Sequence, residues 1–396
     1  MSDLFTRGVV NIIPNLESLQ KRLESGPMKI YFGIDPTATR IHIGHAVGLR
    51  KLQAFLEAGH EVTFLIGDFT SLIGDTSDKD SERPVLTSEQ INQNFAIYEQ
   101  QASKILDFSR VIVRHNSEWL SNLNFTDIVK LCQHFSAGDF YSRELIRKRL
   151  DEGKRVGLHE VLYAVMQGYD FYHLDADLQI GGTDQTFNMQ AGRTLQKDLR
   201  NKDAFVMSLG YLTGTDGRKM SKSWSNAIWI EDEPKEMYGK LMSIHDELII
   251  EYFTLATKVE LEKIEEIKHG LENGNNPMEF KKLLAHQIVS DLYSKTEAEE
   301  AADHFRLTVQ EGGLPDEIKE VRISSQNSDG STSYINMQPI QIVTQSAGIS
   351  NSEARRLIEQ GAVTLNEIKI TDPFTPIEIP NSSILKVGKR NYFKLV

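Results

Sequence analysis

Cysteine is almost absent from this chain, since Cys132 is the only one among its 396 residues. A single thiol excludes an internal disulfide framework and a zinc site built from several cysteines, and it is typical of a reducing compartment. Long apolar runs are missing too, because no stretch approaches the roughly 18 uncharged apolar residues of a membrane span. The first residues include Asp3, Arg7 and Glu17 and no long apolar segment, so we expect no signal peptide. These features predict a cytoplasmic protein without membrane contact.

An excess of positive charge is also missing. The net charge of −12 argues against a protein that coats nucleic acid nonspecifically. The charge is uneven, however, because residues 338–396 hold 7 Lys and Arg against 5 Asp and Glu, a balance of +2. This asymmetry is compatible with a local nucleic-acid surface on an acidic body, and ordinary fluctuation in a short segment explains it equally well.

The first half of the chain alternates short apolar runs with helical patterns. Residues 30–34 form an apolar run that ends at the turn signal Asp35-Pro36, and a helical pattern then continues to Gly59. Strands separated by helices pair in parallel through right-handed crossovers. We therefore expect an α/β fold with a doubly wound, Rossmann-like parallel sheet, which binds ligands beyond its C-terminal strand ends. Further strands are expected at 61–66, 110–114, 177–181 and 204–209.

The rest of the chain divides by composition. A helical pattern starts at Pro234 and ends near Gly312, and a polar stretch rich in Ser and Asn follows. Ser350 and Glu353 then form a capping-box pattern for a short helix that stops at Gly361. The expected parts are a Rossmann-like domain at 1–233 with a helical insertion at 115–165, an α-helical domain at 234–320, a linker at 321–337 and a small α+β domain at 338–396.

The first motif that carries chemistry is His42-Ile43-Gly44-His45, which opens the first helix after a strand. A helix N-terminus offers free N–H groups and partial positive charge, which favour phosphate. Two imidazoles three residues apart can donate to phosphate oxygens as a transition state gathers charge. Gly44 leaves room for a nucleotide. Taken alone, the tetrapeptide is also compatible with two surface histidines, or with a metal pair for which no third ligand is evident.

The second motif is Lys219-Met220-Ser221-Lys222-Ser223, which follows a turn-rich stretch. Lysines and hydroxyls on a mobile loop suit a triphosphate, because Lys supplies point charge to the leaving pyrophosphate and the loop can close during the reaction. Taken alone, a basic loop is more often simply solvated. The two motifs in this order, with the sheet between them, resemble the HIGH and KMSKS signatures of the class I aminoacyl-tRNA synthetases.

Other segments resemble the tyrosyl-tRNA synthetases in particular, over nearly the whole chain, and the tail looks like an S4 RNA-binding domain. One departure is Thr186-Phe187-Asn188, where the best-known bacterial members carry Trp-Gly-Asn, so the chain looks like a second bacterial lineage. The segments that carry the resemblance are 31–38 in the first strand, 163–170 in a helix that lines the amino-acid pocket, 179–185, which tryptophanyl relatives share, and the loop 74–83.

The residue types in these segments agree with a tyrosine pocket. A phenol hydroxyl needs an acceptor and a donor, and Asp170 and Tyr31 supply them. Tyr163, Gln167 and Asp75 are suited to hold an α-ammonium group. Leaving such buried groups unpaired rejects a substrate that lacks the hydroxyl. Without the motif, a Tyr in an apolar strand is more often a core residue, and an Asp on an apolar helix is often a structural acceptor.

The resemblance implies a two-step synthetase that activates tyrosine with ATP and transfers it to the 3′-terminal ribose of tRNA(Tyr). Phosphate stabilisation is assigned to His42, His45, Thr37, Lys79, Arg83, Lys219, Lys222 and Ser223. Tyrosine binding is assigned to Tyr31, Asp75, Tyr163, Gln167, Asp170 and Gln185. ATP binding is assigned to Gly33, Asp35, Gly44, Gly181, Gly182, Asp184 and Lys222. RNA binding is assigned to Arg355, Arg356, Lys386, Lys389 and Arg390.

The same resemblance implies partners and leaves two alternatives open. Mg²⁺ is expected to arrive with ATP rather than in a protein-bound metal site. The family acts as a homodimer, with 115–165 near the subunit contact, and the helical domain is expected to meet the anticodon region. One alternative is a tryptophanyl-tRNA synthetase-like enzyme, which the pair Tyr31 and Asp170 argues against. The other is an RNA-binding protein with a structural role, against which the two complete motifs argue.

Overall fold

The computed structural model describes residues 2–36, 39–74, 87–221, 224–310, 318–323, 334–380, 382–388 and 391–396. The chain divides into two compact units, Met1–Ala298 and Glu299–Val396, and each has a hydrophobic core of its own. No helix among the described residues is long and apolar enough to cross a membrane.

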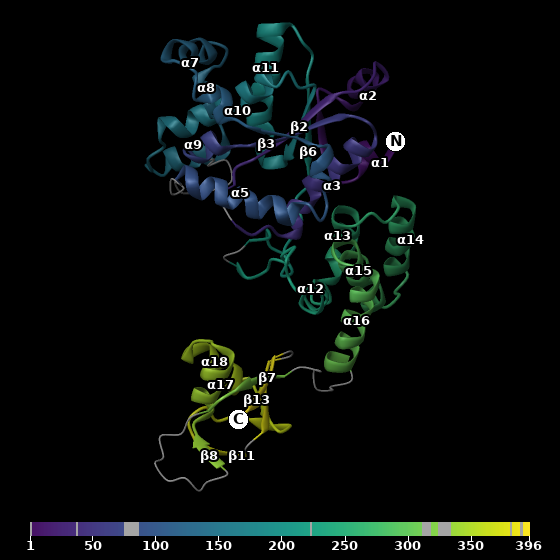
Figure 1. Cartoon of the computed structure of the whole chain (residues 1–396), viewed down its shortest axis with the longest axis vertical. Coiled ribbons are helices and arrows are strands. Elements are labelled where there is room, and N and C mark those ends of the chain that lie inside the picture. The colour runs from purple at the N-terminus through teal and green to yellow at the C-terminus, as the bar shows by residue number, and fades with distance from the viewer. Residues whose placement is uncertain are drawn as a thin grey trace. The chain divides into compact units, whose positions relative to one another are not determined.

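The first unit begins with alternating strands and helices (Figure 1). Its strands are β1 (Val9–Ile13), β2 (Lys29–Ile34), β3 (Glu61–Ile66), β4 (Ile112–His115), β5 (Leu178–Gly182) and β6 (Phe205–Leu209). Its helices up to β6 are α1 (Ser2–Thr6), α2 (Leu16–Glu24), α3 (Ile43–Glu57), α4 (Asp68–Ser71), α5 (Ser88–Ala102), α6 (Ser117–Leu120), α7 (Phe125–Cys132), α8 (Ala137–Tyr141), α9 (Glu144–Asp151), α10 (Leu158–His173) and α11 (Thr186–Arg200).

The described strands of this unit form one sheet in the order β1-β6-β5-β2-β3-β4. The strands β2 to β6 pair in parallel, which confirms the predicted doubly wound sheet. From β2 the chain proceeds outward through β3 and β4 and then returns to β5 on the other side of β2. The strand order therefore reverses between β2 and β5, where such sheets bind ligands. The antiparallel edge strand β1, which pairs with β6, was not predicted.

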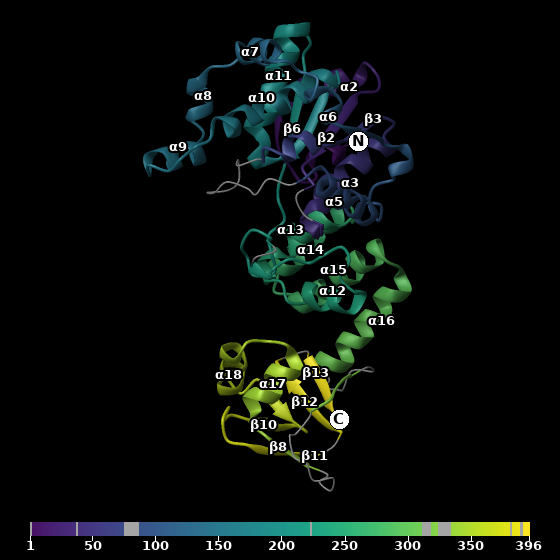
Figure 2. The ribbon, with the colours of Figure 1, turned by 60° about the vertical axis from the view of Figure 1, so that its left-hand side comes forward.

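Sequence and packing agree on why these segments fold as they do. The strand β3 is buried from Val62 to Ile66, and β2 buries Ile30 and Tyr31, as expected where a parallel sheet is covered on both faces. The helix α3 buries Leu49, Leu52 and Phe55 on the face that it turns to the core. The described segment between β4 and β5 holds the helices α6 to α10 and no strand, and α10 and α11 pack side by side (Figure 1, Figure 2).

A helical region follows β6, as the sequence pattern predicts. The helices of this region are α12 (Pro234–Leu241), α13 (Ile249–Ala256), α14 (Leu261–Glu272), α15 (Pro277–Leu292) and α16 (Lys295–Phe305), and a π-helical turn, η5 (Arg306–Gln310), comes after them.

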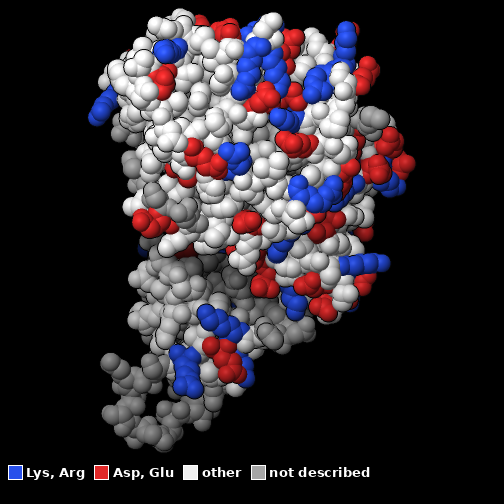
Figure 3. All heavy atoms as spheres, turned by 45° about the horizontal axis from the view of Figure 1, so that its top comes forward, with Lys and Arg blue, Asp and Glu red and all other residues white. Residues whose placement is uncertain are grey.

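On the face of the first unit that Figure 3 draws, acidic and basic side chains are interspersed among uncharged residues.

The second unit is a small α+β fold. Its described strands form a sheet in the order β10-β9-β12-β13-β7 and a ribbon of β11 and β8. Ser350 caps α18 by accepting a hydrogen bond from the backbone N–H of Glu353, as the sequence predicts. The elements are β7 (Lys319–Val321), β8 (Tyr334–Met337), α17 (Pro339–Ala347), α18 (Asn351–Glu359), β9 (Val363–Leu365), β10 (Ile368–Ile370), β11 (Ile377–Pro380), β12 (Ser383–Val387) and β13 (Asn391–Leu395).

Two strands of this unit lie before residue 338, where the sequence pattern places the end of the helical domain and a linker. The strand β7 pairs in parallel with β13, and β8 pairs with β11. Val321 and Met337 pack against the same core as Ile342 and Leu385. Composition alone misses these strands because each is short and next to a polar stretch, so only the pairing partner far along the chain reveals it.

Candidate active site

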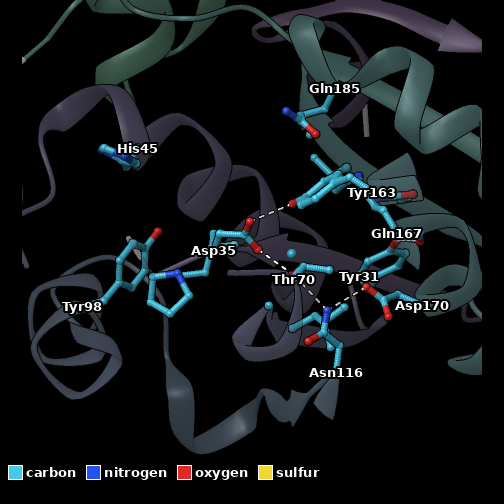
Figure 4. Close-up of a pocket in the computed structure, with 18 of the residues that line it drawn as sticks. Tyr31, Asp35, His45, Thr70, Tyr98, Asn116, Tyr163, Gln167, Asp170 and Gln185 are labelled. Atoms are coloured by element: carbon cyan, nitrogen blue, oxygen red, sulfur yellow. Dashed lines mark hydrogen bonds between the residues drawn. The ribbon is translucent and has the colours of Figure 1, made fainter. Parts of the chain in front are cut away.

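A cavity of about 300 Å³ opens at the carboxyl ends of β2 and β5, at the reversal of strand order. Figure 4 shows its lining, with Asp170 and His45 on opposite sides. We call the part around Tyr31, Asn116 and Asp170 the closed end, and the part around Arg40 and His45 the histidine end. Ten of the residues assigned from sequence line this cavity: Tyr31, Gly33, Asp35, His45, Tyr163, Gln167, Asp170, Gly181, Asp184 and Gln185.

The closed end is organised around the carboxylate of Asp170, which is 2% exposed. Trp119 donates its indole N–H to Oδ1 of Asp170 at 2.7 Å, and Asn116 donates its amide to Oδ2 at 3.1 Å. The Tyr31 hydroxyl donates to the carbonyl of Gln167 at 3.4 Å. Both oxygens of the buried acid are therefore satisfied and its orientation is fixed.

Burial sets the ionisation of this end. It raises the pKa of Asp170 to about 8, against the opposing effect of the hydrogen bonds from Trp119 and Asn116. Burial, followed by the nearby charge of Asp170, also raises the pKa of Tyr31. The Tyr31 hydroxyl therefore keeps its proton and can donate, while Asp170 keeps its own proton up to about pH 8 and offers its oxygens as acceptors to a second hydroxyl.

The hydrogen-bond network continues from Asp170 to the middle of the cavity. The same Asn116 amide donates to Thr70 Oγ1 at 3.0 Å, and Thr70 in turn donates to Asp35 at 2.8 Å. The other oxygen of Asp35 accepts from the Tyr163 hydroxyl at 2.9 Å (Figure 4). Gly67 makes room for this arrangement, because a Cβ there would lie 2.0 Å from Asp35 Oδ1. The network fixes Asp35 and Tyr163 before any ligand binds.

Two amide oxygens in the lining lack a partner within the described residues. Oε1 of Gln167 and Oε1 of Gln179 are buried and accept no hydrogen bond. Gln179 lies on β5 directly beside Tyr31 on β2. Buried acceptors without donors cost free energy, so they point to a ligand that brings N–H or O–H groups.

The histidine end begins at the N-terminus of α3. His42 is the N-cap residue, and its backbone N–H donates to Nδ1 of His45 at 3.2 Å. Their ring centroids are 4.0 Å apart. Because Nδ1 of His45 accepts, its proton resides on Nε2, which makes that nitrogen a donor. The backbone N–H groups at the start of α3 and the imidazole N–H groups are thus hydrogen-bond donors, which suit an anion at this end of the cavity.

Both imidazoles are uncharged at neutral pH. Burial first, and then the nearby His45 and Lys219, lower the pKa of His42 to about 2. Burial also lowers the pKa of His45 to about 4. Gly44 supports this packing in a way the sequence did not indicate, because a Cβ on it would lie 2.8 Å from Nδ1 of His42. The absence of a side chain at Gly44 makes room for the imidazole of His42. Gly44 itself does not line the cavity.

Backbone pairing joins the two sequence motifs. The N–H of Ile43 donates to the carbonyl of Ile228 at 2.9 Å, and the N–H of Ile230 donates to the carbonyl of Ile41 at 3.1 Å. A bridge between His42 and Trp229 lies between these bonds. The segment that follows the lysine-rich motif is therefore fixed to the residues that precede α3. This places Lys219 close enough to His42 to lower its pKa.

Comparisons with known proteins give the family. The profile described as tRNA synthetases class I (W and Y) matches residues 23–310. This chain belongs to that family. The synthetase is 41% identical over 403 residues to the tyrosine–tRNA ligase of Carboxydothermus hydrogenoformans, covering 100% of this chain and 97% of the relative. It is 38% identical over 394 residues to the tyrosine–tRNA ligase of Thermotoga maritima, and the match covers 99% of this chain and 96% of the relative.

Solved structures of similar fold include two tyrosyl-tRNA synthetases. One is a C-terminally truncated mitochondrial enzyme of Aspergillus nidulans, with a TM-score of 0.63, 21% identity and 77% of this chain and 92% of that chain covered. The other, from Archaeoglobus fulgidus, is complexed with L-tyrosine. It has a TM-score of 0.60 and 22% identity, and the match covers 76% of this chain and 99% of that chain. At these identities the likeness concerns the fold of the synthetase.

Several assigned residues of the synthetase lie outside the described residues, and others lie outside the cavity lining. His42, Gly44, Gly182 and Lys219 are described but do not line the cavity. In the second unit Arg355 and Arg356 are exposed on α18, where they pair with Glu359 and Glu353. Lys386 lies 5.0 Å from the ring of Tyr392. The assigned residues outside the described residues are Thr37, Asp75, Lys79, Arg83, Lys222, Ser223, Lys389 and Arg390.

The structure also adds residues that the motifs missed. Arg40, Thr70, Asn116 and Gln179 line the cavity, and Trp119 supports Asp170 from behind. A polar Gln in an apolar strand was the one visible signal for Gln179. The others become recognisable only from their contacts. At the sequence departure noted above, Phe187 packs on Phe140 of the insertion with ring centroids 5.1 Å apart, and Asn188 donates to Gln185 at 3.1 Å. No cluster of three or more His, Cys, Asp or Glu side chains suited to a metal occurs within the described ranges.

Proposed function

We propose that this synthetase activates L-tyrosine with ATP and transfers it to the 3′-terminal ribose of tRNA(Tyr), as a tyrosine–tRNA ligase. The observation that carries the choice of amino acid is the closed end, where a buried donor, Tyr31, and a buried acceptor, Asp170, line one small space. A phenol hydroxyl offers a partner to both groups. Phenylalanine brings no hydroxyl to either of them, and discrimination of this kind has the tyrosyl-tRNA synthetases as its standard example.

The remaining groups suit the other parts of tyrosine and ATP. Gln167 Oε1 has no partner among the described residues and suits an ammonium donor, next to the oxygen of Tyr163. Gly181 and Asp184 line the cavity at the end of β5, where adenosine and its ribose hydroxyls fit a Rossmann-like sheet. We assign the phosphates to the histidine end and Lys219.

The chemistry needs no protein nucleophile. An oxygen of the tyrosine carboxylate attacks the α-phosphorus of ATP, the bond from that phosphorus to the bridging oxygen breaks, and pyrophosphate leaves. A ribose hydroxyl of the tRNA then attacks the acyl carbon, and AMP leaves. The protein supplies position and charge stabilisation. His45 donates from Nε2 to the charge that gathers on phosphate, and being neutral it does so without losing a proton.

Further parts of the proposal concern partners. Mg²⁺ enters with ATP and keeps mostly phosphate and water ligands. Exposed Phe125 and Leu158 on the insertion favour a homodimer through 115–165. The helical region and the basic side chains of the second unit are the expected tRNA surfaces, with salt-sensitive binding. The lone Cys132 agrees with a cytoplasmic location.

Amino-acid-dependent exchange of labelled pyrophosphate into ATP tests the proposal. It is run with tyrosine, phenylalanine and tryptophan separately. Exchange with tyrosine alone supports the proposal. Exchange with tryptophan overturns the pocket assignment and leaves the synthetase mechanism. No exchange with any of the three, in folded protein that binds tRNA, favours an RNA-binding role instead.

A further inference from the structure

Arg40 is the only Lys or Arg among the described residues that line the cavity. Asp35, Asp170 and Asp184 line it as well, so acidic side chains outnumber basic ones among the lining residues. A nucleoside triphosphate carries several negative charges and needs cations nearby. Neither sequence motif includes Arg40.

The two histidines do not supply the missing charge. Burial holds the pKa of His42 at about 2 and that of His45 at about 4, so both are neutral donors at physiological pH. Among the described residues, the positive charge near the histidine end comes from Arg40, which lines the cavity, and from Lys219, whose charge reaches His42.

Trp229 holds Arg40 in place at this end. The guanidinium carbon of Arg40 lies 4.6 Å from the centre of the Trp229 ring. Such a contact favours a guanidinium lying on the ring, which leaves its edge N–H groups free to donate to oxygens in a forked pair. Trp229 is itself bridged to His42 through the backbone, and their rings are 5.8 Å apart. The position of Arg40 is therefore coupled to the start of α3.

Asp232 does not hold Arg40 firmly. Its carboxylate lies 3.5 Å from the Arg40 guanidinium and is only 4% exposed. It also accepts from Lys240 at 2.7 Å and from the backbone N–H of Trp229 at 2.8 Å. Asp232 would keep these two partners if Arg40 turned away. The Arg40 side chain is 45% exposed, so it can turn toward a ligand without leaving a buried charge unpaired.

We propose that Arg40, lying on the Trp229 ring, contacts the β- and γ-phosphates of ATP and stays with the pyrophosphate as it leaves. This inference rests on the proposed function for its substrate. It predicts a residue that binds the polyphosphate and contributes nothing to tyrosine recognition, because the closed end and the histidine end lie on opposite sides of the cavity (Figure 4).

The test compares Arg40→Gln with a matched variant, Arg200→Gln. Arg200 also lies on an aromatic ring, 4.0 Å from the centre of Tyr172, is also 3.5 Å from an aspartate, Asp175, and is 33% exposed. It is not part of the cavity lining. The measurements are the KM values for ATP, pyrophosphate and tyrosine in exchange, together with the equilibrium affinities for ATP and AMP.

In Arg40→Gln we expect the KM values for ATP and pyrophosphate to rise about 10- to 100-fold, with the KM for tyrosine unchanged. The affinity for ATP falls and that for AMP does not, since AMP lacks the contacted phosphates. Arg40→Lys, which keeps the charge without the planar fork, should recover part of the loss. Arg200→Gln should match the wild type, and all variants should keep its melting temperature.

Unchanged ATP affinity and unchanged KM values in Arg40→Gln would overturn the inference. So would a defect confined to transfer of tyrosine to tRNA, which would assign Arg40 to the RNA. Failure of the proposed function is a separate result, because there the wild type itself shows no exchange with tyrosine. The comparison of ATP with AMP binding still decides the role of Arg40 in that case.

Discussion

At the closed end of the cavity, Asp170 is almost wholly buried and both of its oxygens are hydrogen-bonded, whereas at the histidine end Arg40 is half exposed and only loosely paired. Burial acts on both ends, but with different consequences. It keeps Asp170 protonated up to about pH 8 at one end and leaves the histidines without charge at the other. Under the proposed function, the groups assigned to tyrosine are therefore held in place before it binds, while the charge assigned to the phosphates is on a side chain near the surface.

This difference follows from what each end must do. Selection against an analogue that lacks a hydroxyl requires polar groups that stay unpaired when that analogue binds, so they must be shielded from water. A triphosphate enters from water and leaves as pyrophosphate, so its partners must remain accessible. Substitutions at the two ends should accordingly affect different substrates.

The largest effect is expected for His45→Asn. The Asn oxygen can still accept from the backbone N–H of His42, but the donor at Nε2 is lost. We expect kcat for tyrosine-dependent exchange to fall about 100-fold, with the KM for tyrosine unchanged. His45→Gln, whose amide reaches nearer to Nε2, should restore part of the rate. A rise in the KM for tyrosine as large as the fall in kcat would contradict the division between the two ends.

Asp170→Asn should affect the other substrate. The amide keeps the shape but replaces one acceptor oxygen by a donor, against the donors of Trp119 and Asn116. We expect kcat/KM for tyrosine to fall roughly 10- to 100-fold while the KM for ATP stays the same. Steady-state exchange kinetics with each substrate varied in turn measure both values. Asp198→Asn, a change outside the cavity lining, serves as the control. Equal losses for tyrosine and ATP would show that the two ends are not separable.

Trp119→Phe tests the support behind the pocket. It removes the indole N–H that donates to Asp170 at 2.7 Å and keeps an aromatic ring. We expect tyrosine to bind roughly tenfold more weakly, as one charge-assisted hydrogen bond is lost, with ATP binding unaffected. Titration calorimetry with tyrosine gives the result directly. Wild-type affinity would mean that Asn116 alone orients the acid.

The smallest effect concerns stability and pH. The folded-state pKa of Asp170, about 8, lies above that of an unfolded Asp, near 3.9. The folded state therefore binds the proton more tightly, so the contribution of this group is fully present below pH ~4 and is lost as pH rises through ~8. Relative to Asp170→Asn, whose side chain does not titrate, the wild type should lose a few degrees of melting temperature between pH 5 and 9. A constant difference across this range would contradict the raised pKa.

Much of this protein was predictable because its signals are local. The apolar runs of β2 and β3, the cap at Ser350 and the two phosphate motifs depend on neighbours a few residues apart, so the sequence displays them directly. The strands β1, β7 and β8 were missed because each is short and is stabilised by a partner distant in sequence.

The same contrast between local signals and contacts distant in sequence divides the residues of the site into two classes. The sequence by itself predicted the parallel sheet and the histidine motif, because periodicity and motif spacing are properties of the chain. The pair Tyr31 and Asp170 was predicted through the resemblance to tyrosyl-tRNA synthetases. Only the tertiary structure decided that Trp119 and Asn116 hold the acid, that both histidines are neutral and that Arg40 is the one Lys or Arg in the lining within the described part of the chain. Burial, and the distance between residues far apart in the chain, set these properties, and neither exists before the chain folds.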